Sequence, residues 1–228
     1  FHFDMPIELQ NKYGGWESKH VVDLFAKFAG QCFRLFGDRV TDWFTFNEPL
    51  VIVDGAYLYQ FHYPKIVDGK KAVQVAYNIA LASAKTIAAF REINTNPAGK
   101  IGIILNLTPS YPATEEPEDL AAASFANLWM NDMFLDAAVK GAFPQELVAT
   151  FEEDGVLWNA TTEELQLIGE NTIDVLGVNF YHPNRVQRPS VSADSLAVDW
   201  MPSRYFEEYA MPGRRMNVDK GWEIYPQS

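Results

Sequence analysis

Two segments of the chain are almost continuously apolar, and they constrain its fold more than any other feature. Ile101–Leu107 has the sequence Ile-Gly-Ile-Ile-Leu-Asn-Leu, and Asp174–Tyr181 has the sequence Asp-Val-Leu-Gly-Val-Asn-Phe-Tyr. An unbroken apolar run of this length is typical of a strand that is buried on both faces of a parallel sheet. We expect a third strand at Asp42–Phe46 and the stub of a fourth at Phe1–Asp4.

Helical patterns separate the predicted strands. Apolar residues recur at helical spacing in four segments, which are 21–36, 73–90, 125–139 and 162–169. The stretch Thr162–Leu165 is the expected cap of the last helix. Strands that alternate with helices indicate βαβ units and a parallel sheet. The segments between strands are longer than the roughly 30 residues of a minimal βαβ unit, so long loops should follow the strands. A (β/α)₈ barrel carries its active site in such loops, at the C-terminal ends of its strands.

Three strands and a stub cannot close a barrel. The chain opens at Phe1 rather than at a methionine, and it stops at Ser228 directly after the segment Gly221–Pro226. We therefore expect residues 1–228 to form one incomplete domain that belongs to a longer protein.

Charge and composition restrict the partners. Eighteen Lys and Arg against thirty Asp and Glu give a net charge of −12 and a pI near 4.7, which argues against nucleic acid or an anionic membrane as a partner. No apolar run approaches the roughly 20 residues of a membrane span. The single cysteine, Cys32, excludes an internal disulfide framework and a multi-cysteine metal site, and it fits a reducing cytoplasm. We expect a small molecule as the partner, and neither a metal nor a cofactor.

Polar side chains stand at the end of each predicted strand. They are His2, the pair Asn47 and Glu48, Asn106, and then Asn179 with Tyr181. In a barrel these positions converge on one pocket. Glu48 is the sharpest candidate because it follows a hydrophobic strand and precedes a proline. Apolar surroundings of this kind raise the pKa of a carboxyl group, which is what a general acid needs near neutral pH.

Each of these residues also has a plainer interpretation. Glu48 could cap the following helix, and His2 could be an ordinary surface residue. Asn179 and Tyr181 could satisfy backbone groups at the rim, and Asn106 could be structural. The acidic run at 115–119 is expected to be a solvated helix start, where negative charge suits the helix dipole. The Gly-rich phosphate loop, the dinucleotide fingerprint, the H-E-x-x-H motif and the G-x-S-x-G elbow do not occur.

Six motifs in order carry a family resemblance. Thr45–Pro49 has the sequence Thr-Phe-Asn-Glu-Pro, and the other motifs lie at 2–6, 13–16, 103–106, 134–144 and 176–181. Together they resemble glycoside hydrolase family 1, the retaining β-glucosidases and 6-phospho-β-glucosidases. The resemblance covers essentially the whole chain. It implies a (β/α)₈ TIM barrel of which the chain forms a part, from the end of strand three to just before strand seven.

The resemblance also implies roles for five residues. Glu48 would be the general acid/base, and Asn47 would hydrogen-bond the 2-hydroxyl of the sugar. His2 would contact the glycone hydroxyls. Tyr181 would hydrogen-bond the nucleophilic carboxylate, and Asn179 would support the same pocket. A small-molecule sugar is then the expected partner, and a homo-oligomer of the parent enzyme is left open.

The chain departs from the family pattern in one important respect. The family's nucleophile is the Glu of a Glu-Asn-Gly segment on strand seven, and no such segment follows Tyr181. The segments Tyr57–Pro64, Val178–Pro183 and Gly221–Pro226 look most like those of bacterial 6-phospho-β-glucosidases, which are cytoplasmic. An unphosphorylated β-glucosidase or β-galactosidase and a non-catalytic, truncated sugar-binding fragment are the alternatives. We expect the 228 residues alone to be inactive.

Overall fold

A three-stranded parallel sheet organises the molecule. The computed structural model describes residue 2, residues 4–190 and residues 200–228. The strands β1 (Asp42–Asn47), β2 (Lys100–Asn106) and β4 (Val175–Asn179) lie side by side in the order β1-β2-β4. All three predicted strands are therefore confirmed. The predicted stub includes Phe1 and Phe3, which lie outside the described residues.

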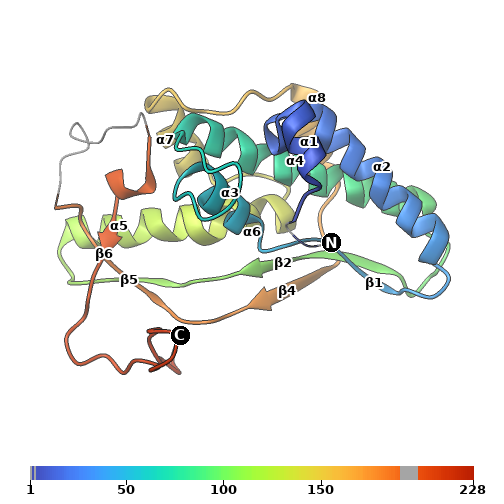
Figure 1. The fold of residues 1–228 in the computed structure, drawn as a ribbon. Helices are drawn as coiled ribbons and strands as arrows, with labels where there is room; N and C mark the ends of the chain where they lie inside the picture. The colour runs from blue at the N-terminus through green and yellow to red at the C-terminus, as the bar shows by residue number, and fades with distance from the viewer. Residues whose placement is uncertain (1, 3, 191–199) are drawn as a thin grey trace.

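Helices gather on one side of this sheet, and the C-terminal segment lies on the other side (Figure 1). The helices are α1 (Ile7–Tyr13), α2 (Lys19–Phe36), α3 (Pro49–Tyr57), α4 (Gly69–Ile93), α5 (Pro117–Asn127), α6 (Met133–Val139), α7 (Gln145–Glu153) and α8 (Thr162–Glu170). The core lies between helices and sheet, where Ile101, Ile103 and Leu105 of β2 are buried. Parallel strands with helices on one face form part of a (β/α)₈ barrel.

A β-bulge in β1 places two successive side chains on the same face of the sheet. Phe44 and Asn47 pair with β2 residues that are only two positions apart, so Thr45 and Phe46 together oppose one residue. Both are fully buried on the helix side, and the Thr45 hydroxyl lies 2.8 Å from that of Ser83 on α4. Asn47, which pairs with Ile104, faces the opposite side of the sheet, which in a barrel is the interior.

The predicted helix over 125–139 is not continuous. A π-helical segment, Leu128–Asp132, separates α5 from α6. Asn127 precedes this turn and Asn131 lies within it, and the Asn131 amide donates to the Asn127 side-chain oxygen at 3.0 Å. Each also bonds the backbone that follows β2, at Ser110 and at Thr108 respectively. The two asparagines at this widened turn therefore fix the loop at the C-terminal end of β2.

A second small sheet extends beyond the first. It has the order β3-β5-β6 and consists of Ser110–Pro112, Asn184–Gln187 and Glu207–Glu208. The segments β3 and β5 run parallel, whereas β5 and β6 run antiparallel. These short strands are built from the loops that follow β2 and β4, and the sequence pattern did not predict them.

The acidic run before α5 is only partly solvated, which corrects one expectation. Asp119 is buried, and its carboxylate accepts hydrogen bonds from the Thr114 hydroxyl at 2.6 Å and from the Arg188 amide at 2.9 Å. The Thr114 hydroxyl and then the Arg188 amide lower the pKa of Asp119. This side chain ties the start of α5 to the end of β5.

The cap of α8 is formed one residue earlier than the sequence suggested. Thr161, not Thr162, is the N-cap, and it forms a capping box with Glu164. We expect Thr161→Ala to lower the free energy of unfolding in urea by about 1 kcal/mol, because an orphan amide loses its acceptor. The matched change Thr162→Ala should alter it by less than about 0.5 kcal/mol. Equal losses in the two variants would contradict this assignment.

Candidate active site

Glu48 stands at the C-terminal end of β1 in a backbone conformation that few residues adopt. Its amide donates to the Ile104 carbonyl at 2.8 Å, which continues the ladder to β2. Its φ of 51° and ψ of 56° are left-handed. A non-glycine residue in this region is strained, and such strain is concentrated at functional sites.

The helix-cap interpretation of Glu48 does not fit the structure. The residue occupies the N-cap position of α3, but its side chain makes no capping hydrogen bond. Pro49 occupies the first turn of the helix, where the missing amide hydrogen leaves no helical hydrogen bond unmade. The carboxylate of Glu48 instead faces the end of β4.

Four of the five predicted site residues meet at this point. The Asn179 side-chain amide donates to Glu48 Oε1 at 2.7 Å and to Asn47 Oδ1 at 3.1 Å. The Tyr181 hydroxyl donates to the same Glu48 oxygen at 2.5 Å, and its expected contact with the nucleophilic carboxylate remains a prediction. Asn47 and Glu48 come from β1, whereas Asn179 and Tyr181 come from the end of β4, so the sheet brings together side chains more than 130 positions apart.

This arrangement has an electrostatic consequence for the phenol. The hydrogen bond to Glu48 raises the pKa of Tyr181, and burial and the negative charge of the carboxylate add to this effect. Tyr181 remains 48% exposed, and Glu48 and Asn179 are half-buried. A carboxylate that two neutral donors orient at the mouth of a parallel strand can give or take a proton at a bound substrate.

The structure places His2 and Asn106 in different surroundings. The hydrogen bond that the structure gives for His2 joins its Nδ1 to Asp4 at 2.7 Å, on an exposed part of the chain. His2 also lines a pocket of about 520 Å³ against Trp16 and Phe25. Its role as a sugar ligand remains a prediction. Asn106 is the register neighbour of Asn179 on β2, which places the two on one face of the sheet.

An aromatic hollow adjoins the Glu48 cluster. It has a volume of about 260 Å³, and Tyr181, Trp222 and Tyr225 are among its lining residues. The Trp222 ring lies 5.4 Å from the Tyr181 ring and 5.3 Å from the His182 ring, measured between centroids. His182 therefore packs against this tryptophan as well.

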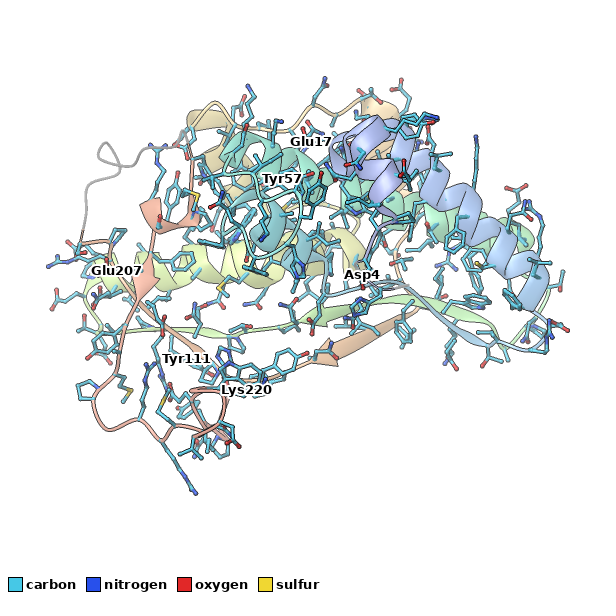
Figure 2. The ribbon with its side chains drawn as sticks, in the orientation of Figure 1. Asp4, Glu17, Tyr57, Tyr111, Glu207 and Lys220 are labelled. Carbon is cyan, nitrogen blue, oxygen red and sulfur yellow. The ribbon has the colours of Figure 1, made fainter. Side chains whose placement is uncertain are left out.

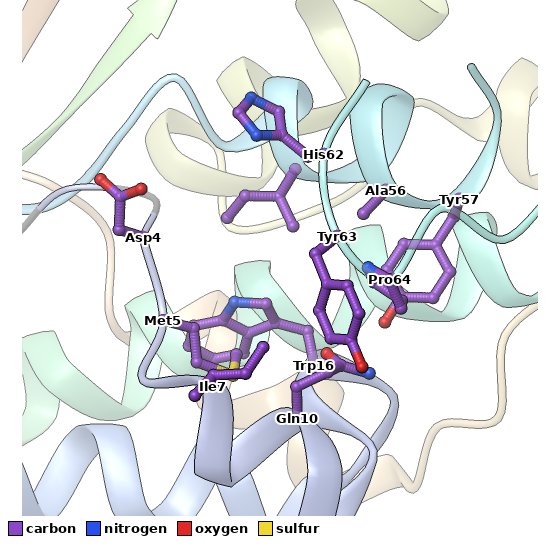
Figure 3. Close-up of a pocket in the computed structure, with 11 residues that line it drawn as sticks. Asp4, Met5, Ile7, Gln10, Trp16, Ala56, Tyr57, His62, Tyr63 and Pro64 are labelled. Carbon is purple, nitrogen blue, oxygen red and sulfur yellow. The ribbon is translucent and has the colours of Figure 1, made fainter. Parts of the chain in front are cut away.

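Another cavity lies between α1, α3 and the loop that follows α3 (Figure 3). Its volume is about 150 Å³, and its lining includes Asp4, Trp16, Tyr57 and His62. The side chains of Trp16 and Tyr57 are buried, and Trp16 Nε1 has no hydrogen-bond partner among the described residues. Glu48 does not line this cavity, so we keep it separate from the candidate active site.

Sequence reasoning missed two further groups of interest. Asp54 on α3 is one of them, because burial raises its pKa to about 7, an effect that a hydrogen bond from Trp129 partly offsets. The other is an ion pair between Arg185 and Glu223, with a shortest distance of 2.8 Å. Asp54 sits in an apolar stretch, which is a weak signal. Arg185 and Glu223 are 38 residues apart, and no local pattern connects them.

The described part of the chain contains neither a cluster suited to a metal ion nor a helix suited to crossing a membrane. No group of three or more His, Cys, Asp and Glu side chains there is arranged to hold a metal ion. No helix there combines the length and the apolar character that crossing a membrane requires.

The chain belongs to glycosyl hydrolase family 1, whose sequence model matches residues 1–228. Among curated proteins it is similar to the 6-phospho-beta-glucosidase GmuD of Bacillus subtilis (strain 168), with 51% identity over 225 residues that cover 99% of this chain and 48% of that protein. The chain spans about half the length of the curated relatives it matches.

Solved structures agree with this assignment. The family 1 β-glucosidase from Thermotoga maritima is 31% identical with a TM-score of 0.84, and the match covers all of this chain and 47% of that one. Virulence factor SghA from Agrobacterium tumefaciens is 27% identical with a TM-score of 0.86, and the match covers 99% and 47% of the two chains. The predicted family and the predicted partial (β/α)₈ barrel are confirmed.

The contact between Tyr181 and Glu48 can be tested by titration. We expect Glu48→Gln to bring the pKa of Tyr181 down towards the ordinary tyrosine value of about 10, because a neutral amide no longer favours the protonated phenol. The measurement is a pH titration of ¹³C-labelled tyrosine side chains by NMR, in which Tyr181→Phe identifies the signal. Glu146→Gln on the exposed face of α7 should leave the titration unchanged. An unaltered Tyr181 curve in Glu48→Gln would contradict the contact.

Proposed function

We propose that this chain carries the acid/base half of the active site of a retaining β-glycosidase. The observation that carries the proposal is the Glu48 carboxylate, held at the end of β1 by Asn179 and Tyr181. In the first step Glu48 protonates the glycosidic oxygen as the bond breaks. In the second step it takes a proton from the water that releases the sugar.

The proposed mechanism needs a second carboxylate. Retaining glycosidases place the two carboxyl groups about 5 Å apart, so that one attacks the anomeric carbon while the other donates a proton. No Glu-Asn-Gly segment occurs in the 228 residues. We therefore assign the nucleophile to a residue outside this sequence, and we propose that the 228 residues alone do not turn over substrate.

The remaining candidate residues take roles in sugar binding. Asn47 shares the Asn179 amide at 3.1 Å, which places its side chain next to Glu48. A hydrogen bond from Asn47 to the sugar 2-hydroxyl would strengthen as the ring flattens towards the transition state. His2 is proposed to contact the glycone hydroxyls, with Asp4 orienting its imidazole through the 2.7 Å hydrogen bond.

The proposed substrate is a 6-phospho-β-glucoside, hydrolysed in the cytoplasm in the course of carbohydrate metabolism. The 51% identity to a 6-phospho-beta-glucosidase supports this choice, since Beta-glucosidase A from Acetivibrio thermocellus is 31% identical over a similar length. An unphosphorylated β-glucoside or β-galactoside is the alternative within the same reaction class. A non-catalytic fragment that only binds sugar is the alternative outside it.

Glu48→Gln in the full-length gene product tests the acid/base role. We expect kcat for a substrate with a poor leaving group, such as an alkyl β-glucoside 6-phosphate, to fall by about 10²- to 10⁴-fold, the usual contribution of general acid catalysis. A nitrophenyl substrate should suffer less in the first step, because its leaving group needs little protonation. Glu146→Gln is the matched control. Unchanged turnover in Glu48→Gln would remove Glu48 from the mechanism.

The substrate class is tested by comparing two substrates of the wild-type gene product. We expect kcat/KM for 4-nitrophenyl β-glucoside 6-phosphate to exceed that for the unphosphorylated glucoside by at least about tenfold, the value of one lost charged contact. The 228-residue chain should hydrolyse neither. A preference for the free glucoside would favour the alternative, and turnover by the short chain would refute the assignment of the nucleophile.

A further inference from the structure

The ion pair between Arg185 and Glu223 is unusually well enclosed. The guanidinium donates through Nε at 3.1 Å and through a terminal nitrogen at 2.8 Å to the two carboxylate oxygens. Its side chain is 11% exposed, and that of Glu223 is 6% exposed. The guanidinium also contacts the rings of Tyr111 and Tyr225, at 4.9 and 4.6 Å from their centroids, and these two rings pack edge to face with 5.6 Å between their centroids. The ion pair is therefore bidentate, and its guanidinium also contacts two aromatic rings.

The two partners come from different parts of the fold. Tyr111 and Arg185 are register neighbours in the β3–β5 pair, so the strand pairing itself places the ring over the guanidinium. Glu223 belongs to a C-terminal hairpin, which we define as residues 215–225. Tyr111 and Lys220 both lie on the side of the sheet away from most helices (Figure 2).

The C-terminal hairpin is internally ordered. The Asn217 amide donates to the Trp222 carbonyl and the Ile224 amide donates to the Arg215 carbonyl, both at 2.7 Å. The Asn217 side chain accepts from the Lys220 amide at 2.9 Å and closes the turn. The hairpin is thus a small preformed unit, and the ion pair docks it against β5.

Docking places Trp222 beside the candidate active site. Its ring contacts the Tyr181 ring at 5.4 Å, and Tyr181 donates to Glu48. Only four positions separate Tyr181 from Arg185, so the strand that holds the ion pair directly continues the segment that carries the phenol. The hairpin contributes Trp222 to this contact, and the ion pair fixes the position of the hairpin.

We propose that Arg185 and Glu223 are a positioning pair, which docks the C-terminal hairpin so that Trp222 packs against the Tyr181 ring and fixes the phenol at the candidate active site. This inference rests on the proposed function of Glu48. A buried ion pair is weak evidence for stability, because desolvation offsets its attraction, whereas it specifies one geometry well. Arg185 and Glu223 act through Tyr181 and need not touch the substrate.

The docking step is tested by limited trypsin digestion of the full-length gene product. Arg214, Arg215 and Lys220 lie in or next to the hairpin. We expect Glu223→Gln to speed cleavage after these residues by about tenfold, because proteolysis follows the population of the locally open state. Cleavage after Arg39 on the far side of the molecule should not change. The control is Glu208→Gln, which removes an exposed charge 3.9 Å from Arg214. Equal digestion of Glu223→Gln and wild type would overturn the proposal.

The link to Tyr181 is tested by two further measurements. The pKa of Tyr181 should fall towards the ordinary tyrosine value in Glu223→Gln, and should stay raised in Glu208→Gln. In kinetics, Glu223→Gln should lower kcat by about ten- to a hundredfold, the size of effect expected for a misplaced site residue. The double variant Glu223→Gln/Tyr181→Phe should be no slower than Tyr181→Phe alone, since both changes remove one interaction.

These measurements separate a positioning role of Glu223 from an independent one. Additive losses in the double variant would give Glu223 a role independent of Tyr181 and overturn the positioning proposal. The digestion and the tyrosine titration do not depend on catalysis. If the gene product had no glycosidase activity, these two measurements would still decide whether the ion pair docks the hairpin and holds Tyr181.

Discussion

The backbone pairing of β2 with both of its neighbours is the constraint on which the rest of the structure depends. β2 lies between β1 and β4. Its hydrogen bonds fix the register of both outer strands, and the register decides where each of them ends relative to β2. Because the strands are parallel, their carboxyl ends finish together, and Glu48 meets Asn179 across the end of β2. The helices cover the face on which Ile101, Ile103 and Leu105 of β2 lie, and Asn47, Asn106 and Asn179 lie on the other face.

The candidate site places two neutral hydrogen-bond donors against a carboxylate. The Asn179 amide and the Tyr181 phenol orient the Glu48 side chain without pairing it with a cation. Arg185, the cationic side chain nearest in sequence to Tyr181, pairs with Glu223 instead. A structural ion pair on β5 thus lies only a few residues from the candidate site at the end of β4.

The sequence predicted the elements that local patterns specify and missed those that depend on distant partners. The apolar runs of β2 and β4 and the position of Glu48 were visible, because strand burial and the following proline leave local signatures. The π-helical turn was not, since it accompanies bonds from Asn127 and Asn131 to a loop some 20 positions away. Asp119 looked like surface charge for the same reason. The pairing of Arg185 with Glu223 exists only once the chain has folded.

The bulge in β1 has a consequence for how this site tolerates mutation and evolution. Thr45 and Phe46 can each be exchanged for residues of similar size, at the modest cost of ordinary core repacking. Removing either one would take away the bulge and restore strict alternation, in which Asn47 still faces the interior. What would be lost is one of the two side chains that this part of β1 buries against the helices, and with it a filled volume in the core. Loss of the bulge should therefore weaken the packing at this point while leaving the direction of Asn47 unchanged.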